Sequence, residues 1–413
     1  MNGGFCLHLR GYLTPECKPL DFNTSRHGLR RILHNLFRKE TQSEGIVFSR
    51  PLALLESDDW GRVGVRDREG FDQLRANGIR LGEHPYDLYT LETANDVGEL
   101  AALLMRHRDS SGRPASLVMN FCLANLDFTR MKAAAYRRVE LLSLGNGLPG
   151  GWSRPGLFEA YKKGIRQGVF YPATHGLTHF CPLAMENALA ENADRARLLR
   201  TFWEAETPYV YWRMPWIGYE YWNPGKPQAG FLRPQRQREL IQQSCSESLA
   251  FFGRKAVSAC APGYRANRDT HRAWAESGVR VVQNGTGSGL QAPYIDEFGL
   301  LHVFRAIDLE PALKEIQTKK YLEIACACVA RGIPIVISVH AINFHSSLKD
   351  FRSTTLNALD SLLTALESKF PDLLYVNHEE LYKAATDGTL PSGERYAAPG
   401  TRMLRRPELQ EAL

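Results

Sequence analysis

Pro51-Leu52-Ala53-Leu54-Leu55-Glu56-Ser57-Asp58-Asp59-Trp60-Gly61 is the most informative stretch of this chain. It begins as an unbroken apolar run and ends in carboxylates and a glycine. Such a run, followed at once by polar residues, is typical of a buried parallel strand whose carboxyl end leads into a loop. Because these loops gather at one face of an α/β protein, we expect polar residues from other strands to meet Asp58 and Asp59 there.

Apolar, strand-like runs alternate with helical segments from Pro51 onward. The clearest strands are predicted at Pro51–Leu55, Ala115–Phe121, Val169–Ala173, Ala256–Ala261, Val279–Gln283, Leu301–Arg305, Ile333–Val339 and Leu373–Asn377. Helices are predicted at Asp96–Arg108, Pro155–Gln167, Ala184–Ala205, Gln235–Phe252, Asp269–Ser277, Lys314–Ala330 and Ser353–Phe370. About seven or eight βα units predict an α/β fold, a distorted (β/α)7-8 barrel that need not be fully closed.

The chain divides into three parts on this interpretation: an extension at 1–45, the barrel at 46–386 and a tail at 387–413. Within the extension, Thr24–Glu40 has the pattern of an amphipathic helix with a basic face. Such a helix can rest on an anionic membrane surface, which would give peripheral membrane contact through 24–40. It can also pack on the domain with its charges in water, which is the commoner arrangement.

Composition indicates an ordinary globular protein, since 44% of the 413 residues are hydrophobic and 23% are charged. The formal charge of +6 includes no dense basic run, which argues against nucleic-acid binding. The eight cysteines include no Cys-x-x-Cys pair, and neither a secretion signal nor a membrane span is recognisable. We therefore expect reduced thiols and a cytoplasmic protein. The oligomeric state is left open.

One segment, the aromatic-rich insertion at 202–234, departs sharply from the background. It contains Trp203, Tyr209, Tyr211, Trp212, Trp216, Tyr219, Tyr221 and Trp222, spaced by prolines and glycines. Aromatic rings above a barrel mouth can stack on sugar rings. Equally, the segment can fold into a small core of its own or form a dimer contact.

Histidines at two further strand ends suggest a metal site. His175 and His179 lie four residues apart, and His340 closes the strand predicted at Ile333–Val339. Two imidazoles and one carboxylate form a three-ligand face that leaves a position for water. Gly176 stands where a zincin carries its glutamate, which argues against a metalloprotease of that type.

Together these motifs resemble the polysaccharide deacetylase superfamily, the NodB-homology domain of carbohydrate esterase family 4. Ser57-Asp58-Asp59-Trp60-Gly61 resembles its first motif, His175 and His179 its second, and Ser338-Val339-His340 its last. Pro262-Gly263-Tyr264-Arg265 lies where the third is expected. The resemblance covers roughly Pro51 to Ala385. It is strongest to a branch of bacterial proteins associated with surface-polysaccharide synthesis, through Asn120, Asn125-Leu126-Asp127-Phe128 and His340-Ala341-Ile342-Asn343-Phe344.

This resemblance implies a role for each motif residue. Asp59, His175 and His179 would hold a divalent metal, with Zn2+ the first choice for a nitrogen-rich set. Asp58 would be the general base, and His340 would protonate the leaving group. A backbone N–H near Tyr264 would stabilise the oxyanion.

Two departures from the family pattern concern the residues that support this site. Cys260 replaces the arginine that opens the third motif, and Arg265 or Arg305 are the candidates to replace it. The fourth motif is not recognisable, so Asp308 or Glu310 would have to support His340. Other candidates for substrate contact or support are Asn120 and Trp60, whereas His84 and His345 are expected to be ordinary loop histidines.

The function expected is metal-dependent removal of an N- or O-acetyl group from a sugar, in a polysaccharide or a lipid- or nucleotide-linked precursor. A glycoside hydrolase or another C–N hydrolase on the same barrel is one alternative, because related barrels host these reactions. A carbohydrate-binding protein with an impaired catalytic site is the other. The missing arginine favours the last reading, and retention of Asp58 opposes it.

Overall fold

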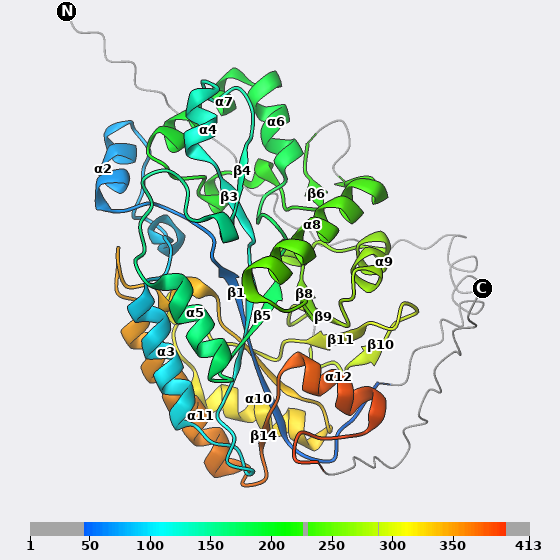
Figure 1. The fold of residues 1–413 in the computed structure, drawn as a ribbon. Helices are drawn as coiled ribbons and strands as arrows, with labels where there is room; N and C mark the ends of the chain where they lie inside the picture. Colours follow the sequence, from blue (N-terminus) through cyan, green and yellow to red (C-terminus); the bar gives the residue numbers. More distant parts are fainter. Residues whose placement is uncertain (1–44, 226–229, 288, 394–413) are drawn as a thin grey trace, which may run out of the picture. The chain divides into compact units, whose positions relative to one another are not determined.

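The computed structural model describes residues 45–225, 230–287 and 289–393 (Figure 1). All of them belong to one unit of the chain, Ser43–Leu413. The helix predicted at Thr24–Glu40 and the tail beyond residue 393 lie outside the described residues. The membrane contact expected for that helix therefore stays a prediction.

A sheet of ten strands forms the centre of the fold, in the order β10-β11-β9-β8-β5-β2-β1-β13-β12, with β14 also paired to β1. Every ladder is parallel except that between β10 and β11. The strands are β1 (Leu52–Trp60), β2 (Leu117–Phe121), β5 (Phe170–Thr174), β8 (Ser258–Cys260), β9 (Val281–Asn284), β10 (Tyr294–Ile295), β11 (Leu301–Phe304), β12 (Ile307–Asp308), β13 (Ile335–Ser338) and β14 (Leu374–Tyr375). Two short hairpins stand apart, β3 (Ala124–Leu126) with β4 (Leu141–Ser143), and β6 (Trp222–Asn223) with β7 (Gly230–Phe231).

Two strands that are consecutive in the chain, β11 and β12, lie near opposite ends of the strand order. β11 pairs with β9 and β12 pairs with β13, yet only Arg305 and Ala306 separate β11 from β12. The expected α/β class with a large parallel sheet is thus confirmed. Among the described strands the ladders stop short of a closed barrel.

Most strands of the sheet bury both of their faces, as near-continuous apolar runs predict, whereas β10 at the edge is only partly buried. Alternate residues form one apolar cluster on what we call the inner face, including Leu52, Leu54, Val118, Ala173, Val281, Val303, Val336 and Leu374. The residues between them pack with the helices, including Ala53, Leu55, Leu117, Met119, Val282, Ile335 and Ile337. Because side chains alternate along a strand, the inner face continues at the carboxyl ends into polar side chains: Glu56, Asp58, Asn120, His175, Cys260, Gln283, Ser338 and His340.

Most helices cover the outer side of the strands, and Figure 1 shows α3, α5 and α11 together along one side of β1 and β5. α12 instead contributes Leu381 and Ala384 to the inner apolar cluster. The helices are α2 (Arg68–Ala76), α3 (Ala94–Arg106), α4 (Phe128–Ala133), α5 (Leu157–Arg166), α6 (Pro182–Glu191), α7 (Ala193–Glu204), α8 (Pro234–Phe252), α9 (Arg268–Glu276), α10 (Thr318–Ala330), α11 (Arg352–Lys369) and α12 (His378–Asp387). None of the helices in the described part of the chain is long and apolar enough to cross a membrane.

The helix predicted at Ala184–Ala205 is wrong in one respect, because it is two helices. Asn192 has extended backbone angles, φ −138° and ψ 101°, which interrupt the helix between α6 and α7. Its side chain accepts a hydrogen bond from the Arg195 N–H and so caps α7. Asparagine favours such a cap over a helix interior, which the apolar periodicity alone did not indicate.

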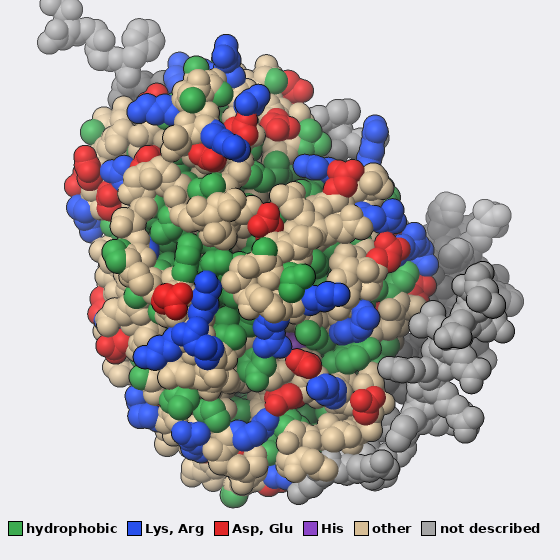
Figure 2. Space-filling view, viewed as in Figure 1, with side chains coloured by type: hydrophobic (Ala, Val, Ile, Leu, Met, Phe, Trp, Pro, Cys, Tyr) green, Lys and Arg blue, Asp and Glu red, His purple; other side chains and the backbone are tan. Residues whose placement is uncertain are grey.

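The buried aromatic residues of the insertion join the main hydrophobic core, where Tyr209 packs against Phe180 and Tyr221 packs against Trp274. Trp203, Tyr209 and Tyr221 are buried, and the Trp203 indole N–H donates to the Pro208 carbonyl at 3.1 Å. Trp212 differs, because 40% of it is exposed. On the face drawn in Figure 2, basic and acidic side chains are interspersed, with no large region of a single charge.

A substitution in the inner apolar cluster should be costly. We expect Leu54→Ala to lower the free energy of unfolding by about 3 kcal/mol, because it leaves a cavity among side chains that cannot collapse into it. Urea denaturation measures the change. Leu249→Ala is the control, since Leu249 is 43% exposed and its loss should cost about 0.5 kcal/mol or less. Equal losses in both variants would contradict this account of the core.

Candidate metal centre and active site

The carboxyl end of β1 brings two adjacent aspartates to one cavity. Neighbouring residues in a regular strand point to opposite faces. Here the register between β1 and β2 shifts between Ser57 and Trp60, and Asp59 has a φ of 77°. This bulge turns Asp59 so that it lines the same cavity as Asp58. A non-glycine residue in this conformation is strained, which is a common feature of functional sites.

Asp59, His175 and His179 converge as a metal site requires. The Oδ1 atom of Asp59 lies 3.6 Å from Nε2 of His175 and 3.4 Å from Nε2 of His179. Their ligand atoms all fall within 4.8 Å of one another. Oδ1 of Asp59 is buried and accepts no hydrogen bond from the described residues. Such an atom is costly unless something else satisfies it, and a cation between the three side chains would do so.

Both imidazoles are in the form that a metal needs. Nδ1 of His175 lies 2.9 Å from the Cys260 carbonyl oxygen, so it carries the hydrogen and leaves the Nε2 lone pair toward Asp59. Burial lowers the pKa of His175, and it lowers the pKa of His179 to about 3. Both rings are therefore neutral near pH 7 and can coordinate a cation.

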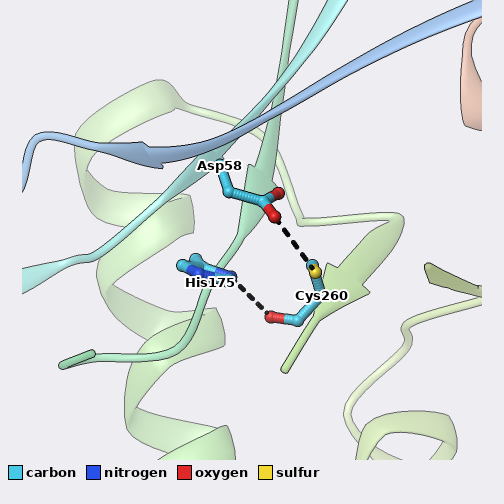
Figure 3. Close-up of side chains that lie close together, drawn as sticks. All are labelled: Asp58, His175 and Cys260. Atoms are coloured by element: carbon cyan, nitrogen blue, oxygen red, sulfur yellow. Dashed lines mark hydrogen bonds between the residues drawn. The ribbon is translucent and has the colours of Figure 1, made fainter. Parts of the chain in front are cut away.

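Two other groups of potential ligands fit a metal less well. Figure 3 shows Asp58, His175 and Cys260 together, with the Cys260 thiol 3.8 Å from Asp58 Oδ2. Burial raises the pKa of this thiol well above its usual value, so it stays protonated. In the second group, His271, Asp296 and His302, both Asp296 oxygens already accept hydrogen bonds.

Two residues that the sequence interpretation missed hold the metal ligands in place. Arg62 contacts the other oxygen of Asp59, with Nη2 3.1 Å from Oδ2. Oε1 of Glu220 accepts hydrogen bonds from the N–H groups of Leu177 (2.8 Å) and Thr178 (3.1 Å), in the turn between the two histidines. Gly176 is required there, because its φ is 84° and a Cβ would collide with the Glu220 carboxylate.

Asp58, the expected base, is bound by Arg305, one of the two arginines considered for this role. Nη1 and Nη2 of Arg305 donate to its two oxygens at 2.7 and 2.6 Å, and Nε donates to Glu56 at 2.8 Å. Asn120 donates a further hydrogen bond to Asp58 at 2.7 Å. Burial would raise the pKa of Asp58, but the charge of Arg305 outweighs it and holds the pKa well below the usual range. Asp58 is therefore ionised and fixed in orientation.

His340, the expected acid, is paired with Glu310, one of the two carboxylates considered for this role. Its Nδ1 lies 2.6 Å from Glu310 Oε1, and its Nε2 lies 3.7 Å from Asp58 Oδ2. Burial would lower the pKa of His340, but Glu310, Asp58 and Asp59 raise it to about 9. Asp308 instead accepts a hydrogen bond from Ser338. The imidazole is therefore charged and able to donate a proton.

Of the remaining candidate site residues, Tyr264 lines the cavity, whereas Arg265 and Trp60 do not. Tyr264 lines the cavity, and its hydroxyl accepts a hydrogen bond from Arg305 Nη1 at 2.5 Å. Its own N–H donates to the Ala261 carbonyl, so an oxyanion donor would have to be a neighbouring group. Arg265 lies over the Trp222 ring, and Trp60 is fully buried against Phe344.

The two histidines expected to be ordinary are not equivalent. His345 is buried, with its Nε2 3.3 Å from Glu92, and supports the core. His84 caps the short helix Pro85–Leu88 and also lines the cavity, which makes it a candidate for ligand contact. No local sequence signal distinguishes the two, because the contacts come from distant segments.

All five residues of the candidate centre line one cavity of about 320 Å3. They are Asp58, Asp59, His175, His179 and His340. The rest of its wall is mostly aromatic or basic: Arg62, His84, Tyr86, Tyr89, Tyr209, Trp212, Tyr219 and Tyr264. A cavity with a few convergent polar groups and an aromatic wall is typical of a small-molecule site.

Comparisons with known proteins find distant structural matches. No family model and no curated protein matches. A solved structure from Mycobacterium smegmatis, described as a polysaccharide deacetylase, is 14% identical, with a TM-score of 0.43 over 88% of this chain and 96% of that one. A 4-alpha-glucanotransferase from Thermococcus litoralis is 10% identical, with a TM-score of 0.44 over 81% of this chain and only 40% of its own length.

A family 4 carbohydrate esterase described as a pseudoenzyme, from Bacillus anthracis, is also similar. It is 10% identical, with a TM-score of 0.31 over 82% of this chain and 68% of that one. Further polysaccharide deacetylases and family 4 esterases match at the same level. At these identities and TM-scores, any functional argument has to rest on the site itself.

The metal site can be tested by removing its ligands. We expect Asp59→Ala and His175→Ala each to lose about one equivalent of bound zinc, because two ligands are insufficient for a tight site. Elemental analysis of the purified full-length chain measures this. His271→Ala is the matched control and should keep its metal. Loss of metal in the control alone would indicate that the metal binds to the second group of ligands, His271, Asp296 and His302.

The charge of His340 can be tested through Glu310. We expect Glu310→Gln to lower the pKa of His340 from about 9, because the neutral amide no longer favours the imidazolium. A raised pKa means that the protonated form is present below it and is lost as the pH rises through it, so loss of the proton should begin at lower pH. NMR titration of labelled histidine measures this, and an unchanged pKa would contradict the pairing.

Proposed function

We propose that this protein is a metal-dependent hydrolase that removes an acyl group, N- or O-linked acetyl in the first place, from a sugar. One observation carries the proposal. A three-ligand site, an ionised carboxylate fixed by arginine and a charged imidazole face a single small cavity. Acyl hydrolysis needs these three parts: a Lewis acid, a base and a proton donor.

Asp59, His175 and His179 would hold the cation, for which zinc fits the two nitrogens and one oxygen. When bound, it would supply Lewis acidity that activates water near neutral pH and polarises the acyl carbonyl. Arg62 keeps Asp59 from rotating, because it binds the oxygen that faces away from the histidines. Glu220 holds the turn that carries both imidazoles.

Asp58 would accept the proton of the attacking water. Its hydrogen bonds to Arg305 and Asn120 fix its orientation and make it a weak base, so it would act only on a water of lowered pKa. His340, charged through Glu310, would donate a proton to the departing nitrogen or oxygen. The separation of 3.7 Å between Asp58 and His340 would let each stabilise the other's charge.

The substrate we propose is a saccharide or its lipid- or nucleotide-linked precursor. A cavity of about 320 Å3 favours one sugar residue at the centre over a long stretch of polymer. All six cysteines in the described part of the chain are free thiols, which supports a reducing compartment and hence a precursor.

Acetate release tests the reaction class. Purified full-length protein with zinc should release acetate from N-acetylglucosamine oligosaccharides and leave a free amine, while the number of sugar units stays the same. Shortened oligosaccharides would indicate a glycoside hydrolase instead. Binding without any product would indicate a carbohydrate-binding protein.

Substitution of Asp58 distinguishes a catalytic role from a role in metal binding. We expect Asp58→Asn to lower kcat by about a hundred- to ten-thousandfold, because the amide cannot accept the proton, while the metal content stays close to wild type. Kinetics and elemental analysis on the same preparation measure both effects. Full turnover in this variant would remove Asp58 from the mechanism.

A further inference from the structure

Exposed aromatic side chains gather at the mouth of the cavity. Only five large hydrophobic residues are exposed among those that the structure describes: Leu183, Trp212, Leu249, Tyr264 and Leu313. Two of the five, Trp212 and Tyr264, line the same cavity. They are 40% and 44% exposed. An aromatic ring left in water beside a ligand site is a candidate contact surface.

The Trp212 indole is held in a fixed position by a fully buried carboxylate. Its Nε1–H donates to Oδ1 of Asp87 at 2.9 Å. Arg213 donates to both Asp87 oxygens at 3.1 Å, and its guanidinium lies 4.1 Å from the Trp212 ring centroid. Asp87 also accepts hydrogen bonds from the N–H groups of residues 82, 83 and 84. An exposed ring with this support does not have to be ordered when a ligand binds.

A polar side chain stands beside the indole. The His84 ring centroid is 5.1 Å from that of Trp212, and its Nδ1 accepts a hydrogen bond from the Tyr86 N–H. In the neutral ring the hydrogen is then on Nε2, which can donate to a hydroxyl group. An exposed aromatic ring beside a hydrogen-bond donor matches a pyranose ring, whose CH face is apolar and whose rim carries hydroxyls.

We propose that Trp212 and His84 form an accessory sugar subsite, which binds the residue next to the one that is deacetylated. The inference rests on the proposed function and extends it. The cavity accommodates about one sugar, so a neighbouring unit has to lie at its mouth, where Trp212 is exposed. The protein would therefore prefer an oligosaccharide to a monosaccharide.

Binding measurements on chains of different length test the subsite. The probes are N-acetylglucosamine and its di-, tri- and tetrasaccharides, titrated calorimetrically into full-length protein carrying Asp58→Asn to prevent turnover. We expect Trp212→Ala to weaken tetrasaccharide binding by about tenfold and to leave monosaccharide binding nearly unchanged, since the stacking contact is lost only for the longer ligand. Trp212→Phe should bind the tetrasaccharide with an affinity between those of the protein with intact Trp212 and Trp212→Ala.

Leu249→Ala is the matched control, because Leu249 is equally exposed but does not line the cavity. Unchanged tetrasaccharide binding in Trp212→Ala would overturn the subsite and leave the proposed function intact. If no oligosaccharide binds the protein with intact Trp212, both proposals fall. If only uridine diphosphate N-acetylglucosamine depends on Trp212, the indole stacks on a base and the accessory sugar subsite is overturned.

Discussion

The buried ion pairs of Arg305 are the interaction on which the rest of the site depends. The guanidinium is 2% exposed and lies between Glu56 and Asp58 of β1. It comes from the two-residue break between β11 and β12, so it joins β1 to the segment that links two strands far apart in the strand order. Buried charged groups are stable only when they are paired and hydrogen-bonded, and loss of Arg305 would remove the positive charge that Glu56 and Asp58 share. The same contact that secures the strands therefore aligns the proposed base.

Around this pair, the proposed site is built from constrained conformations. Asp59 has a left-handed backbone, Gly176 approaches the Glu220 carboxylate closely, and Arg62 holds the outer oxygen of Asp59. The left-handed backbone of Asp59 costs free energy that the surrounding core has to offset. In return, Asp59 Oδ1 and the two imidazoles face one point before any ligand arrives, which lowers the cost of binding a cation there. The Asp87 contacts prepare Trp212 in the same way at the mouth of the cavity.

The position of the charged groups follows from the alternation of side chains in strands. On the inner face of β1, Leu52 and Leu54 are followed by Glu56 and Asp58, and the neighbouring strands change from apolar to polar in the same direction. Apolar side chains thus fill one end of the inner face, and polar side chains converge at the carboxyl ends. The apolar side chains next to the charged groups lower the local dielectric constant, and electrostatic interactions between these groups are therefore strong.

The sequence by itself determined eight of the ten strands of the large sheet, all but β10 and β12. It also determined the parallel α/β class and the meeting of Asp58, Asp59, His175, His179 and His340, because apolar periodicity and strand-end polarity are local signals. It left open whether Arg265 or Arg305 binds Asp58, and whether Asp308 or Glu310 pairs with His340. It also gave no indication of Arg62, Glu220 or His84 in the site. Only the tertiary structure decided these points, because they depend on the direction of side chains from segments far apart in the chain. Periodicity says which face a residue occupies, but not which distant partner it meets.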